Sequence, residues 1–165
     1  RIPEDSIFIV ILDNTRAGMR GNDLVGISNN ILPILYNSKA EIPKPMANIE
    51  LLRLIKATSI DKGIIQFKHA IFIDKDGYSF NGFEENLNTI GYNYISNGDL
   101  ISAVKILKFT TEQFPNSANA HDSLGEAYLK NNQLDLALQH YTKSYELDPK
   151  NENAKKRIEE IHKLK

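Results

Sequence analysis

Two serine–lysine pairs have the spacing of a nucleophilic acyl-transfer site. The Ser-x-x-Lys pairs are Ser59 with Lys62 and Ser102 with Lys105. In such a site a serine at a helix start attacks an acyl group, and a desolvated lysine accepts its proton. Lys105 falls on the outer face of an expected helix, where it stays solvated, and Ser59 falls in a turn between helices. We therefore expect no catalytic residue in this chain.

The carboxylates near residue 75 resemble the start of a calcium-binding loop. Asp74 to Gly77 read Asp-x-Asp-Gly, like the first four positions of such a loop. A calcium-binding loop would continue with an oxygen ligand at the fifth position and a glycine at the sixth. Tyr78 and Ser79 stand at those two places instead. We expect an ordinary turn.

The remaining chemistry-bearing residues show no ligand spacing. The four histidines are His69, His121, His140 and His162. None belongs to a His-Glu-x-x-His pattern, no cysteine is present, and no glycine-rich phosphate loop occurs. We expect partly exposed helical histidines, no metal and no cofactor.

Composition excludes two classes of partner. The 165 residues include 20 basic and 21 acidic side chains, a formal net charge of −1, which gives no general attraction to nucleic acid. No apolar run approaches the roughly 18 residues that span a bilayer. The hydrophobic content of 41% and charged content of 25% are those of a globular domain.

Residue types recur with a period of 34 along the second half of the chain. Gly91, Tyr94, Ala103 and Pro115 return as Gly125, Tyr128, Ala137 and Pro149. This pattern resembles tetratricopeptide (TPR) repeats, which are helical hairpins, over residues 84 to about 165. Small residues allow two helices to approach closely, so we expect Gly125 to face Ala137. Asn81 with Glu84, and Ser117, are expected to cap the first helix of each repeat.

The segments outside the two repeats predict further elements. Ser6–Leu12 is apolar on both faces, as in a doubly buried strand, and Asp23–Tyr36 carries a helical apolar stripe. Helices are also expected at Asn48–Ala57 and Asp61–Phe72. For the latter, a β-hairpin turning at Asp76-Gly77 is the alternative, but it would abandon the stripe of Ile64, Phe67 and Ile71. Beyond Pro149, Ala154, Ile158 and Ile161 mark a capping helix.

These elements predict a mainly α fold of TPR-type hairpins, an α–α superhelix, preceded by a strand–helix segment. We divide the chain into three parts. Residues 1–42 form the strand–helix segment, which would be a remnant of a hydrolase domain or a dimerisation arm. Residues 43–80 form a linker with a degenerate helical hairpin, and residues 81–165 form two TPR repeats with a capping helix. The isolated strand would expose unpaired backbone at both edges, so we expect self-association through residues 6–36.

The first 43 residues contain a short N-terminal segment, a strand and a helix in an order found in a known family. Arg1–Asp5, a buried strand ending in Leu12-Asp13-Asn14, and a helix leading to Tyr36 and Ile42-Pro43 resemble the end of a class C β-lactamase or penicillin-binding-protein-like serine hydrolase. Some bacterial members carry a helical-repeat tail, to which Asp122–Tyr128 is similar. The resemblance implies catalytic motifs upstream of Arg1 and a periplasmic location. We expect a piece of a longer protein.

The groove that such repeats form is the expected binding site. In the TPR family it is lined by the first helix of each hairpin, which implies a site that includes Asn88, Tyr92, Asn119, Asp122, Glu126 and Lys130. TPR proteins that hold a C-terminal carboxylate use Lys and Asn at two of these places, where this chain has Asn88 and Tyr92, then Asp122 and Glu126. Acidic residues there would repel a carboxylate.

We therefore expect a non-catalytic module that binds a protein or peptide, or the parent hydrolase domain itself, with neither nucleic acid nor a membrane span. Two alternatives stay open. One is a free-standing TPR adaptor whose first 36 residues form a dimerisation arm. The other is an enzyme whose active site is not recognisable from these motifs.

Overall fold

The chain divides into two units, residues 1–44 and residues 45–165. The structure is a computed structural model, and it describes residues 44–164. The predicted strand at Ser6–Leu12, the helix at Asp23–Tyr36 and the self-association through residues 6–36 lie outside the described residues.

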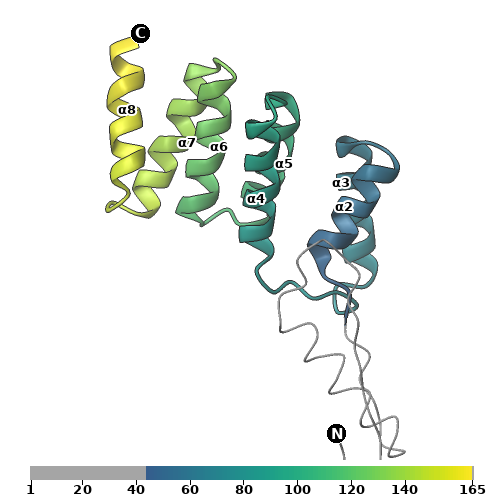
Figure 1. The fold of residues 1–165 in the computed structure, drawn as a ribbon. Coiled ribbons are helices and arrows are strands. Elements are labelled where there is room, and N and C mark those ends of the chain that lie inside the picture. Colours follow the sequence, from purple (N-terminus) through teal and green to yellow (C-terminus); the bar gives the residue numbers. More distant parts are fainter. Residues whose placement is uncertain (1–43, 165) are drawn as a thin grey trace, which may run out of the picture. The chain divides into compact units, whose positions relative to one another are not determined.

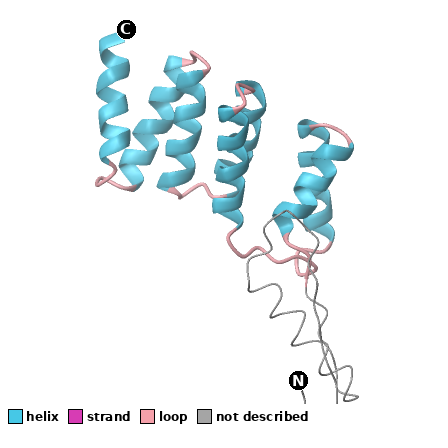
Figure 2. Ribbon diagram, in the orientation of Figure 1, coloured by secondary structure: helices cyan, strands magenta, loops and turns pink. Residues whose placement is uncertain are grey.

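Seven helices make up the described part of the chain (Figures 1 and 2). They are α2 (Ala47–Ala57), α3 (Ile60–Ile73), α4 (Phe83–Ser96), α5 (Leu100–Gln113), α6 (Ala118–Lys130), α7 (Leu134–Leu147) and α8 (Glu152–Leu164). Helices α2 and α3, α4 and α5, and α6 and α7 pack as hairpins, and α8 packs on α7. The prediction of a mainly α fold is confirmed. No strand occurs between residues 44 and 164.

The first hairpin settles the alternative at Asp76-Gly77. Helix α3 runs to Ile73, and the chain then turns, with the Asp74 Oδ1 atom accepting a hydrogen bond from the Gly77 backbone N–H at 2.8 Å. The Ser79 N–H donates to the Pro45 carbonyl at 2.9 Å, which ties the linker before α4 to the start of α2. The segment is helical, as the apolar stripe predicts, and the carboxylate of Asp74 stabilises an ordinary turn.

Helix capping follows the sequence prediction at one repeat and departs from it at the other. The Ser117 hydroxyl accepts a hydrogen bond from the Ala120 N–H at 3.1 Å, so Ser117 caps α6 as predicted. The prediction that Asn81 caps α4 is wrong, because the residue before that helix is Gly82, with φ 61° and no side-chain cap. Glycine adopts this left-handed conformation without steric cost.

Glycines bring the two helices of each repeat into contact. A Cβ atom added at Gly91 would lie 2.5 Å from the Leu107 side chain, and one at Gly125 would lie 3.1 Å from the Tyr141 ring. The two pairs are related by the 34-residue period. The nearest neighbour of Gly125 on α7 is Tyr141, the larger residue one helical turn beyond the expected partner Ala137.

A leucine at Gly125 is expected to overpack this contact. The side chain would collide with the ring of Tyr141, which is fully buried, and the free energy of unfolding should fall by about 1–3 kcal/mol. Urea denaturation monitored by circular dichroism measures the loss. Lys130→Ala on the exposed side of the same helix should stay within about 0.5 kcal/mol. Equal losses for the two variants would refute this packing register.

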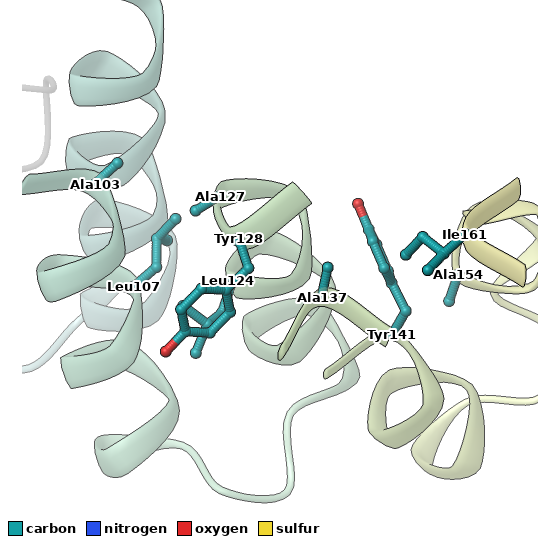
Figure 3. Packing of buried hydrophobic residues seen from close by; sticks show 9 residues of the cluster. All are labelled: Ala103, Leu107, Leu124, Ala127, Tyr128, Ala137, Tyr141, Ala154 and Ile161. Atoms are coloured by element: carbon teal, nitrogen blue, oxygen red, sulfur yellow. The ribbon is translucent and has the colours of Figure 1, made fainter. Parts of the chain in front are cut away.

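The core of the second repeat continues into the last helix. Its buried members are Ala103, Leu107, Leu124, Ala127, Tyr128, Ala137, Tyr141, Ala154 and Ile161 (Figure 3). Figure 3 shows the Tyr141 ring between Ala137 on one side and Ala154 and Ile161 of α8 on the other. Helix α8 therefore covers the apolar face that the last hairpin would otherwise expose.

Aromatic rings fill a second core around the first hairpin. Phe67 of α3 is fully buried, and its ring centroid lies 5.7 Å from that of Phe83, 6.1 Å from that of Phe109 and 6.4 Å from that of Tyr78. These partners come from α4, α5 and the linker between α3 and α4. One side chain thus joins the first hairpin to the next.

Two ion pairs also join α3 to α5. The Lys105 Nζ atom lies 2.5 Å from the Asp61 Oδ2 atom, and the Lys68 Nζ atom lies 2.6 Å from the Glu112 Oε2 atom. Both pairs connect residues 44 positions apart, and all four side chains are substantially exposed.

Candidate peptide-binding surface

Adjacent helices α4 and α6 present the predicted site residues. Tyr92 lies on α4 and Glu126 lies 34 residues later on α6, at the equivalent place in the next repeat. The Tyr92 hydroxyl donates a hydrogen bond to the Glu126 Oε2 atom at 3.1 Å. Burial raises the pKa of Tyr92, so its hydroxyl keeps its proton at neutral pH.

Glu126 also has a cationic neighbour on its own helix. The Lys130 Nζ atom lies 3.6 Å from the Glu126 Oε1 atom, and the two side chains are 47% and 27% exposed. This pair is accessible to solvent, so it contributes little to stability and can exchange for a pair with a ligand. Tyr92, Glu126 and Lys130 form one connected polar group, which we call the Tyr92 cluster.

Asp122, one turn before Glu126, has a different environment. Its Oδ1 atom accepts hydrogen bonds from the Asn151 Nδ2 atom at 3.0 Å and the Asn153 Nδ2 atom at 3.1 Å, and its Oδ2 atom accepts from Asn153 at 2.9 Å. Burial raises the pKa of Asp122, and these asparagine donors oppose that rise. The side chain ties α6 to the start of α8.

Alanine at Asp122 is expected to loosen the docking of α8. The substitution removes three hydrogen bonds to a half-buried carboxylate, and the free energy of unfolding should fall by about 1–3 kcal/mol. Urea denaturation measures the change. Glu159→Ala, an exposed carboxylate on α8, is the matched control and should stay within about 0.5 kcal/mol. A loss no greater than that of the control would show that the asparagine contacts carry no stability.

The other two predicted site residues are not part of the Tyr92 cluster. Asn88, one turn before Tyr92, is only 6% exposed, and neither its Nδ2 nor its Oδ1 atom has a hydrogen-bond partner in the structure. Asn119 is exposed on the first turn of α6. The structure therefore brings three of the six residues into contact and places the remaining three at separate positions nearby on α4 and α6.

The serine–lysine pairs have structural contacts of their own. The Ser59 hydroxyl accepts a hydrogen bond from the Lys62 backbone N–H at 3.3 Å and caps α3. Lys105 forms its ion pair with Asp61, as described above, and the Ser102 N–H donates to the Asp99 carboxylate at 3.0 Å. The Lys62 side chain is exposed, and the Lys105 side chain is 40% exposed in its ion pair.

Two histidines for which the sequence predicts no pairing lie side by side in the structure. His121 of α6 and His140 of α7 stack with ring centroids 5.2 Å apart, and their Nδ1 atoms lie 3.0 Å from each other. They are 19 residues apart in the chain, a spacing that matches no ligand motif. The register of the α6–α7 hairpin brings them together. Aligning the two helices of the hairpin in the sequence could therefore have predicted this pair.

Metal-binding clusters and membrane-spanning helices were both sought among the described residues. Within residues 44–164, no group of three or more His, Cys, Asp or Glu side chains is arranged to hold a metal ion. None of the described helices has the length and apolar character that crossing a membrane requires.

Comparison with known proteins identifies one part of the chain. Residues 118–151 match the tetratricopeptide repeat family model, and this segment contains α6 and α7. No curated protein matches the chain. Residues 118–151 therefore are a tetratricopeptide repeat, and this match together with the helical hairpins supports a TPR-type protein.

Proposed function

We propose that this chain is a non-catalytic module that binds a protein segment along α4 and α6. TPR repeats generally bind proteins or peptides, which supports the class of partner. The observation that carries the proposal is the contact between Tyr92 and Glu126, because equivalent positions of successive repeats meet there in a partly exposed polar group. The binding site includes Asn88, Tyr92, Asn119, Asp122, Glu126 and Lys130.

The charges favour a basic or mixed peptide as the ligand. Among residues 44–164, the ion pair of Glu126 is with Lys130, through a solvent-accessible contact that a lysine or arginine of the ligand can replace. Asp122 adds negative charge one turn away, although its asparagine contacts occupy most of its lone pairs. A ligand that ends in a carboxylate would be repelled by both groups.

The test compares binding of basic, neutral and acidic peptides of one length to the chain by fluorescence anisotropy. Basic peptides should bind most tightly. Glu126→Lys should weaken that binding at least about tenfold, whereas Glu159→Lys makes the same charge change on an exposed part of α8 and should not. Equal binding of all peptides, or equal effects of the two variants, would refute the proposal. Asp122 is left intact because reversing its charge would undock α8.

The parent hydrolase domain is the partner we infer for this surface in the longer protein. This inference rests on the resemblance of residues 1–43 to the end of a β-lactamase-like domain, and that segment lies outside the described residues. A peptide from such a domain would be held in the same chain, so its effective concentration at the surface would be high. Adding the isolated hydrolase domain to the chain with a bound basic peptide tests this inference, because displacement of the peptide would lower its fluorescence anisotropy.

The chain by itself is expected not to hydrolyse a chromogenic β-lactam or a p-nitrophenyl ester. Both serine–lysine pairs engage in capping or ion-pair contacts, and neither offers a desolvated lysine as a base. Absorbance assays measure the rate against buffer. Turnover above buffer that Ser59→Ala abolishes would overturn the non-catalytic assignment, and Ser102→Ala is the matched control.

A further inference from the structure

The paired histidines on α6 and α7 hold two ring nitrogens at a distance that also suits the coordination of a metal ion. The His121 Nδ1 and His140 Nδ1 atoms are 3.0 Å apart, and the two rings are inclined by only 22°. Two nitrogen ligands at 2.0–2.1 Å from one ion, with angles between 90° and 110°, lie about 2.8–3.4 Å apart. The observed separation falls within that range.

The hydrogen bonding of His121 directs a lone pair toward His140. The His121 Nε2 atom lies 3.1 Å from the Pro115 carbonyl oxygen. A carbonyl only accepts hydrogen bonds, so Nε2 carries the hydrogen and Nδ1 of the neutral ring carries the lone pair. A ring nitrogen that donates to a backbone carbonyl while the other binds the ion is the usual arrangement of metal-binding histidines.

His140 is held in place by aromatic neighbours. Its ring lies against His121 on one side, and the Tyr128 ring centroid is 5.5 Å away at 32°. Because the His121 Nδ1 atom carries a lone pair, the hydrogen between the two Nδ1 atoms belongs to His140. The two ligands are thus positioned by the packing of the hairpin.

Solvent reaches this pair through a cavity of about 550 Å³. Its lining residues are Pro115, His121, Gln139, His140, Thr142, Lys143 and Glu146. Lys143 would disfavour a cation, but its Nζ atom lies 3.3 Å from the Glu146 Oε2 atom, so the carboxylate offsets that charge. The cavity gives an ion access and leaves room for water ligands.

We propose that His121 and His140 bind one divalent transition-metal ion through their two Nδ1 atoms. When the ion binds, the hydrogen between the two nitrogens leaves the His140 Nδ1 atom and one is returned by solvent to the His140 Nε2 atom, so each ring keeps a single hydrogen, on Nε2. Water completes the coordination, because no third His, Cys, Asp or Glu of residues 44–164 is grouped with them for a metal. Imidazole ligands suit zinc, nickel and copper, and Cu²⁺ should bind most tightly.

Calorimetric titration of the tag-free chain with ZnCl₂ and with CuCl₂ tests this site. One ion should bind per chain, with copper tighter than zinc. Loss of an outer-shell partner alone lowers metal affinity about 10–100-fold, so His121→Ala and His140→Ala should each weaken binding at least about tenfold. His69→Ala and His162→Ala remove exposed histidines of α3 and α8 and should leave the affinity unchanged.

Electron paramagnetic resonance of the Cu²⁺-loaded wild-type chain gives a second readout that needs no variant. Two equivalent nitrogen couplings are expected. A spectrum with one or no imidazole nitrogen would overturn the site, as would binding that survives in the His121→Ala, His140→Ala double variant with its helical circular dichroism intact. If that variant fails to fold, the wild-type spectrum alone decides, and equal losses in the His69 and His162 variants would also overturn the assignment.

Discussion

Replacing Tyr141 with alanine is expected to lower the free energy of unfolding by about 3–5 kcal/mol. The ring is fully buried between α6 and α8, where it lies against Gly125, and it contributes to the core that includes Ala154 and Ile161. Its removal leaves a cavity among helices that cannot close over it without moving the hairpin. Urea denaturation followed by circular dichroism measures the change.

Because the hydroxyl of Tyr141 is unpaired, we expect that replacing Tyr141 with phenylalanine does not destabilise the fold. The Tyr141 Oη atom is buried and has no hydrogen-bond partner in the structure, and burial raises the pKa of the phenol. Tyr141→Phe keeps the ring and removes the unpaired group, so stability should stay the same or rise by up to about 1 kcal/mol. A loss of more than about 1 kcal/mol in this variant would show that the hydroxyl is engaged in stabilising contacts.

Replacing Phe67 with alanine should cost a similar amount, about 3–5 kcal/mol. Phe67 is the residue through which α3 meets Phe83 of α4 and Phe109 of α5, so its loss should loosen the first hairpin from the rest. Thermal and urea unfolding measure the stability. Hydrogen exchange should also show earlier opening of α2 and α3 than of α6 and α7.

Phe72 on the same helix provides the matched control. Its side chain is 88% exposed, so Phe72→Ala removes the same chemical group from a place where it buries little surface. The free energy of unfolding should then change by no more than about 0.5 kcal/mol. Comparable losses at Phe67 and Phe72 would contradict the described burial of α3.

Much of the hairpin architecture could be predicted because it depends on residue size at fixed spacing. The 34-residue recurrence of small residues at Gly91 and Gly125 requires close helix contact in both repeats, and the structure has it. The partner of Gly125 could not be identified in advance, because Ala137 and Tyr141 lie on the same face of α7 one turn apart. Likewise, the left-handed conformation of Gly82 depends on the path of the preceding linker.

The candidate site was harder to predict because its environment depends on neighbouring helices. The position of Asp122 in the repeat indicates a ligand-binding residue, but its actual hydrogen-bond donors are Asn151, the last residue of that repeat, and Asn153, which lies beyond it. His121 and His140 illustrate the same limit, since each is unremarkable in its own helix. Spacing along one helix carries no information about which side chain of the next helix lies opposite.

The charge order in the two ion pairs between α3 and α5 favours one alignment of these helices. On α3 the acidic residue comes first and the lysine seven positions later, whereas on α5 the lysine comes first and Glu112 follows seven positions later. Sliding one helix by seven residues would place Asp61 opposite Glu112, or Lys68 opposite Lys105. Exposed pairs like these stabilise the fold by at most about 1 kcal/mol each, yet like charges in the shifted arrangements are repulsive. The main effect of these pairs is therefore on specificity, because they disfavour misaligned packing of the hairpins. Such misalignment is a known folding error of chains built from similar repeats.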